Sequence, residues 1–136
     1  MANPNIANSA LKIFGTTDYL TPGGTSALVL LPNSSTSNQV YKINQIVAAN
    51  VNGSSAVDAT VSIYTNGAVA KGSAPSGGAA YPIVSTVSVP ADASLIVVDK
   101  TTAIYLMEGT SITVTSGTAS GITYSISYEV LDGPAT

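Results

Sequence analysis

The charged residues of the chain are four lysines and seven acids. Four of these residues lie in the stretch 89–109, "VPADASLIVVDKTTAIYLMEG". They are Asp92, Asp99, Lys100 and Glu108, and Tyr105 lies between the last two. An acid, a base and a phenol are the groups that proton transfer uses. The same charges also flank apolar runs, which is typical of strand ends. The stretch is therefore either a site for chemistry or two strands with polar ends.

The spacing of the acids argues against a shared catalytic pair. Asp92 and Asp99 are seven residues apart at the two ends of one expected strand, so their Cα atoms would be about 23 Å apart. The paired carboxylates of glycosidases lie within about 10 Å of each other. Asp99 and Glu108 could approach only if the segment between them folds back as a hairpin. We expect both to mark polar turns.

Other kinds of catalytic and binding site lack the residues they need. The chain has no histidine and no cysteine, which removes the familiar nucleophilic triads and the commonest ligands of transition metals. A Ser–Lys pair stays formally possible at Lys100. Asp58 and Asp132 are single acids without a calcium-loop pattern, and the glycines at 23–26 and 76–78 lack the lysine and helix of a P-loop. We predict no catalytic residues, no cofactor and no metal ligands; the protein is expected not to be an enzyme.

Composition limits the kinds of partner that the protein is expected to bind. The net charge is −3, there is no arginine, and the four lysines are spread along the chain, so direct binding to nucleic acid is not expected. No apolar run approaches the roughly 20 residues of a membrane-spanning helix, and residues 1–12 lack the basic and apolar regions of a secretory signal. Charged residues make up only 8%, against about 25% in typical domains. Such a surface is typical of hydroxyl-rich strands or of subunits covered by partners.

The elements that would position these residues are all predicted to be strands. Threonine, valine, isoleucine, serine and tyrosine favour strands, and no segment has an apolar stripe of helical period. Residues 18–24 and 67–80 are expected to be a turn and a flexible surface loop, and 81–90, bounded by prolines, an edge strand. The predicted strands cover 11–15, 25–32, 39–50, 58–66, 81–90, 94–100, 103–107, 111–116 and 122–131.

Two strands carry specific predictions about their faces. In 122–131 the residues Ile122, Tyr124, Ile126, Tyr128 and Val130 alternate with polar ones, so this face is expected to be core or interface. In 39–50 the same period places Tyr41, Ile43 and Val47 on one face and Val40 and Ile46 on the other.

At 136 residues the chain suits one domain. We predict an all-β protein, an antiparallel β-sandwich that is jelly-roll-like, with a short extended N-terminal arm. The arm is assigned to residues 1–10 and the single sandwich domain to residues 11–136. The order of the strands does not follow from the sequence.

Several stretches resemble a family of small virion structural proteins of tailed bacteriophages, notably those that infect cyanobacteria. They are "MANPNI" at the start, "YKINQIVAANVNGSSAVDATVSIY" (41–64), "VSVPADASLIVVDKTTAIYLMEG" (87–109) and "YSISYEVL" (124–131). The resemblance implies a non-enzymatic part of the particle, assembled in the host cytoplasm. It supplies no catalytic residues to carry over.

The expected function is that of a head decoration or cement protein on the capsid surface. Its partners would be the major capsid protein and further copies of itself, expected as a homotrimer. The alternative is a tail, neck or fibre protein with a receptor- or glycan-binding role, which predicts exposed tyrosines around a concave surface. The chain has seven tyrosines but no tryptophan, the aromatic residue that carbohydrate sites often use.

Overall fold

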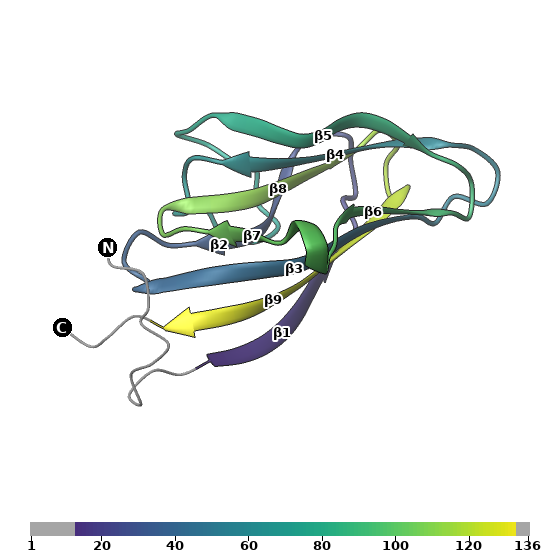
Figure 1. Ribbon diagram of the computed structural model, residues 1–136. Helices are drawn as coiled ribbons and strands as arrows, with labels where there is room; N and C mark the ends of the chain where they lie inside the picture. Colours follow the sequence, from purple (N-terminus) through teal and green to yellow (C-terminus); the bar gives the residue numbers. More distant parts are fainter. Residues whose placement is uncertain (1–12, 133–136) are drawn as a thin grey trace.

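The computed structural model describes residues 13–132, which form two β-sheets (Figure 1). The expected arm at 1–10 and the last four residues lie outside the described part. One short 3-10 helix, η1 (Lys100–Thr102), interrupts the strands. The strands are β1 (Ile13–Leu20), β2 (Leu28–Asn33), β3 (Gln39–Asn50), β4 (Val57–Tyr64), β5 (Ala80–Val89), β6 (Ser94–Val98), β7 (Ile104–Leu106), β8 (Thr110–Ser116) and β9 (Ile122–Asp132).

The strand pairing is that of a jelly roll. One sheet has the order β1-β9-β3-β6, with β7 also paired to β3, and the other has the order β2-β8-β4-β5. The first strand pairs with the last, the second with the next to last, and the fourth with the fifth, so the chain is an antiparallel ribbon rolled up on itself. The predicted all-β antiparallel sandwich is confirmed.

The core lies between the two sheets. Strand β9 contributes the alternating face predicted from its sequence: Ile122, Tyr124, Ile126 and Val130 are all buried, and Tyr128 is partly buried. Leu30, Val61 and Ile112 of the other sheet belong to the same cluster. Burying such side chains removes apolar surface from water, which is the main force that holds the sheets together.

The faces predicted for β3 hold as far as Ile43 but are reversed for Ile46 and Val47, because the strand contains a β-bulge. Ile43 pairs with Tyr128, but the next pair joins Gln45 to Ser127, so Asn44 is an extra residue. A bulge reverses the alternation beyond it. Ile43 and Ile46 consequently both face the core and are fully buried.

Two further points concern the end of β1 and the pairing of β6 and β7. The segment predicted as a turn from residue 18 begins with three more strand residues, because β1 stays paired with β9 as far as Leu20. The strands β6 and β7 do not fold back on each other. Both pair with β3, at Ile46–Ala49 and at Tyr41–Ile43, and η1 links them.

The loop between β4 and β5 is held at many points, in contrast to the flexible loop predicted at 67–80. The Val29 N–H donates to the Ser73 carbonyl at 2.9 Å, and the Gly72 N–H donates to the Val29 carbonyl at 2.8 Å. The Asn66 side chain donates to the Ser76 carbonyl at 2.8 Å. The loop therefore covers the outer edge of β2. The prediction that 81–90 is an edge strand is confirmed by β5.

One buried hydroxyl joins the two sheets. Tyr124 of β9 is fully buried, and its hydroxyl accepts a hydrogen bond from the Thr60 N–H at 3.2 Å and donates to the Thr115 carbonyl. Thr60 and Thr115 are paired residues of β4 and β8. The hydroxyl thus links the backbones of two strands in the opposite sheet. Burial raises the pKa of Tyr124 to about 12.

Replacing Tyr124 with phenylalanine should lower the free energy of unfolding by about 1–3 kcal/mol, because a partly buried N–H and a partly buried carbonyl lose their partner. Urea unfolding followed by circular dichroism measures the change. The matched control is Tyr105→Phe, since Tyr105 is 58% exposed. Equal midpoints for the two variants would contradict the role given to the Tyr124 hydroxyl.

Stability should also fall at high pH. The folded protein raises the pKa of Tyr124 above its ordinary value of 10.0, so folding favours the neutral phenol. That contribution is complete below pH 10 and is lost as the pH rises from about 10 towards 12. The urea midpoint of the native protein should drop over this range, and that of Tyr124→Phe should drop less. A parallel decline in both proteins would assign the loss to other tyrosines.

Candidate functional site

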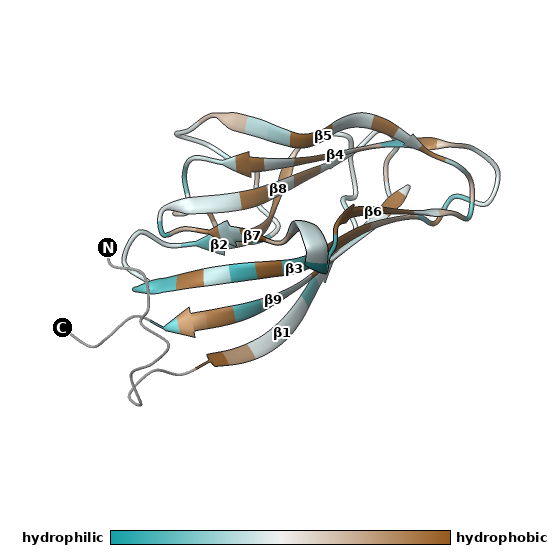
Figure 2. Ribbon diagram, in the orientation of Figure 1, coloured by the Kyte–Doolittle hydropathy of each residue, from teal (hydrophilic) through white to brown (hydrophobic). Residues whose placement is uncertain are grey.

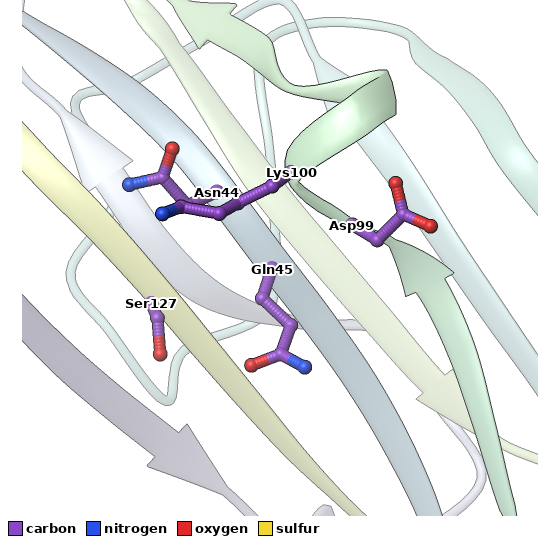
Figure 3. Close-up of a pocket in the computed structure, with 5 residues that line it drawn as sticks. All are labelled: Asn44, Gln45, Asp99, Lys100 and Ser127. Atoms are coloured by element: carbon purple, nitrogen blue, oxygen red, sulfur yellow. The ribbon is translucent and has the colours of Figure 1, made fainter.

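A shallow polar pocket lies where the β3 bulge meets η1. Asn44, Gln45, Asp99, Lys100 and Ser127 line it, and its volume is about 290 Å³ (Figure 3). The bulge places Asn44 there, and Ser127 comes from the neighbouring strand β9. Sequence reasoning singled out Asp99 and Lys100 but missed the three uncharged residues, because the bulge that gathers them has no signal in the sequence of β3 alone.

The Asp99 carboxylate is engaged in local structure. Its Oδ1 accepts hydrogen bonds from the Thr101 hydroxyl at 2.6 Å, the Thr101 N–H at 2.9 Å and the Thr102 N–H at 3.2 Å. The Thr102 hydroxyl accepts in return from the Asp99 N–H at 3.2 Å, which completes a capping box. These bonds, that of the Thr101 hydroxyl first, hold the pKa of Asp99 below its ordinary value because they favour the charged form.

The pocket does not assemble the acid–base pair that residues 89–109 suggested. Figure 3 shows the Asp99 carboxylate directed away from the amides of Asn44 and Gln45. Asp99 is the one acid among the residues that line the pocket. Asn44 donates to Glu129 Oε1 at 3.3 Å from the same strand pair. A lysine beside amides and a hydroxyl can bind a polar group. The pocket brings Lys100 and Ser127 to the same hollow, but the Ser127 hydroxyl is hydrogen-bonded to the Thr17 hydroxyl at 3.0 Å.

The remaining residues of the stretch are separated from this pocket. Asp92 is exposed in the turn between β5 and β6, where its φ is 58°. Glu108 follows β7 in the turn before β8 and is partly buried. Tyr105 lies on β7 and is exposed. The interpretation of Asp92, Asp99 and Glu108 as markers of polar turns is thus confirmed by the positions of all three.

Neither a metal site nor a membrane-spanning helix is found in the described part of the chain. Within residues 13–132 no group of three or more acids, histidines or cysteines is placed to hold a metal ion. In the same residues no helix is long and apolar enough to cross a membrane.

Two buried asparagines, which the sequence did not single out, hold the loops at the two ends of the sandwich. Asn33 at the end of β2 donates to the carbonyls of Gln39 and Leu106, both at 3.0 Å. Asn50 at the end of β3 donates to the carbonyls of Ser55 at 3.0 Å and Val89 at 2.8 Å. Each amide crosses from its own strand to a different part of the chain, so the role of both is structural.

Exposed aromatic residues are spread over the molecule. Tyr19, Tyr81 and Tyr105 are 70%, 62% and 58% exposed, on β1, β5 and β7 respectively. A second shallow pocket is lined by Tyr41, Pro32, two serines and residues 67–70. Tyr41 packs against Tyr128 with ring centroids 5.2 Å apart. None of the three exposed tyrosines lines either pocket, so no aromatic platform over a hollow is formed there.

Comparison with known proteins gives no family. No protein-family model matches the chain, and no curated protein matches it in sequence. Among solved structures the chain is similar to one from a study of Bacillus endospore appendages, described as a novel family of disulfide-linked pili. The two are 16% identical, 92% of this chain and 89% of that chain are covered, and the TM-score is 0.45. A likeness at this level carries no argument about function.

The pKa of the Asp99 carboxyl should lie below its ordinary value, and Thr101→Val should raise it, because the largest stabilising hydrogen bond of the charged form is removed. Thr101→Ser keeps a hydroxyl and should leave the value near that of the native protein. NMR titration of the side-chain carboxyl measures all three. A pKa that does not respond to Thr101→Val would show that the carboxylate is not engaged as a cap.

Proposed function

We propose that the protein is a non-enzymatic structural component of a bacteriophage virion, namely a head decoration protein. In this role several copies bind the major capsid protein and stabilise contacts between neighbouring capsomers. The observation that carries the proposal is the resemblance at 41–64, 87–109 and 124–131. These stretches cover most of β3, β4, β6, β7 and β9. They supply the centre of one sheet and the turns at its ends.

The fold is compatible with this role. Jelly-roll sandwiches occur in viral capsid domains and in lectins, although a fold class by itself does not determine function. A decoration protein stabilises a shell through many weak contacts that act together, because each copy is presented on a repeating lattice. A hydroxyl-rich surface with 8% charged residues suits contacts that do not depend on salt.

The second candidate is a tail, neck or fibre protein that binds a receptor glycan. The exposed faces of Tyr19, Tyr81 and Tyr105 favour it, since sugar rings stack on aromatic side chains. Their positions on three different strands argue for separate weak contacts rather than one site. A glycan array with the native protein and with Tyr19→Ala tests this candidate: binding that the substitution abolishes would support it over decoration.

If the protein is a decoration protein, heads that lack it should release DNA at a lower temperature than complete heads, and adding the purified protein should restore the native midpoint. Fluorescence of a DNA-binding dye during heating measures release. The location is tested by reconstruction of the complete particle, with the sandwich expected on the capsid between capsomers. Density confined to the tail would overturn the decoration role, and absence of the protein from purified particles would overturn the virion role.

A further inference from the structure

Within residues 13–132 the jelly roll leaves four strand edges, at β1, at β6 with β7, at β2 and at β5. The outer side of an edge strand presents N–H and carbonyl groups to any other strand that can approach. Proteins that stay monomeric protect such edges with prolines, bulges, charges, short strands or a covering loop. The protection at each of the four edges can be compared directly.

Three of the edges are protected. The loop at residues 70–73 bonds to Val29 and covers β2. Strand β5 carries Pro82 and a left-handed Thr86 with φ 48°, and its pairing with β4 shifts register twice. Strands β6 and β7 are only five and three residues long, and η1 with its charged cap Asp99 separates them. A continuous strand cannot add along any of these edges.

The first five residues of β1 lack every such device. Residues 13–17, "IFGTT", contain no charge and no proline, and all five are exposed. The strand pairs with β9 in unbroken register over eight residues, so it has no bulge. No strand lies beyond it within the described chain (Figure 1), and it begins with two strongly apolar residues (Figure 2).

Protection begins only at the other end of the strand. Asp18 forms an ion pair with Lys71 of the loop that covers β2, and the Lys71 ammonium lies 5.4 Å from the centre of the Tyr19 ring. The unprotected part of the edge is therefore confined to Ile13–Thr17. There the two adjacent large apolar side chains of Ile13 and Phe14 are 50% and 52% exposed.

We propose that this edge is a self-association surface, on which β1 of a second copy pairs antiparallel about a two-fold axis at Gly15. The sequence around Gly15 is self-complementary in that register. Phe14 comes opposite Thr16 and Ile13 opposite Thr17, so each large apolar residue pairs with a threonine. A glycine in a strand allows another backbone to approach closely.

Two-fold pairing also accounts for the lack of protection. An isologous contact uses the same surface on both subunits, so each open edge closes the other and no edge remains for further addition. The expected assembly is a dimer, in contrast to the homotrimer expected from the sequence. The inference concerns the chain itself and holds wherever the protein is located.

Single-cysteine variants test the contact, because the native chain has no cysteine. In the proposed register the two copies of residue 15 face each other, with Cα atoms about 5 Å apart, within the range that a disulfide spans. Gly15→Cys should therefore give the strongest covalent dimer under mild oxidation in a scan of residues 13–17. A Cβ at Gly15 has space, with its nearest neighbour 4.0 Å away. Tyr81→Cys on the β5 edge is the control and should not cross-link.

Light scattering should give the mass of a dimer for the native full-length protein. Phe14→Lys should weaken dimerisation at least tenfold, whereas Tyr81→Lys, at an equally exposed aromatic position, should not. The cysteine scan decides the question if Phe14→Lys fails to fold. A monomeric or trimeric native protein, or equal cross-linking at residues 15 and 81, would overturn the proposal. A mixture of Ile6→Cys and Gly15→Cys copies gives a further test. Disulfides between the two variants, without dimers of Gly15→Cys alone, would also overturn the proposal, since a neighbour's N-terminal segment would then occupy the edge.

Discussion

Apolar packing holds the two sheets of this sandwich together, and one buried hydroxyl, that of Tyr124, fixes how they lie along each other. Apolar contact brings β9 against β4 and β8 but does not fix how the sheets are positioned along each other, because the hydrophobic effect has no direction. The Tyr124 hydroxyl does, since it must reach the Thr60 N–H and the Thr115 carbonyl together. A shift of one residue would leave the hydroxyl of the fully buried Tyr124 and its two partly buried backbone partners unbonded, which is costly.

With the sheets fixed, the bulge at Asn44 and the amides of Asn33 and Asn50 determine what the surface presents. The bulge turns Ile46 into the core and opens the polar pocket beside η1. The two asparagines hold the strand ends to distant carbonyls. Each amide thereby connects the end of its strand to two other parts of the chain.

The parts of this arrangement that are local were predictable from the sequence, and those that depend on a partner strand were not. Strand β9 has an unbroken period of two, so its buried face was read correctly. The β3 bulge depends on the pairing with β9, where the consecutive residues Tyr128 and Ser127 pair with Ile43 and Gln45 and leave Asn44 extra. The sequence of β3 alone cannot show this. Asn33 and Asn50 look like loop asparagines until Leu106 and Val89 arrive from elsewhere in the chain. The pocket was missed for the same reason.

Because the chain has few charged residues, charged side chains contribute little to the protection of its strand edges. Proteins commonly protect edges with lysine, but the chain has only four lysines. Its exposed sheet surface uses uncharged pairs instead, such as Thr17 with Ser127 at 3.0 Å and Thr21 with Thr123 at 2.8 Å. Edge protection therefore rests on backbone devices: a covering loop, a proline and a left-handed residue. These devices protect β2 and β5, and short strands separated by η1 protect the third edge. A general lack of charge therefore does not account for the absence of protection from the first half of β1.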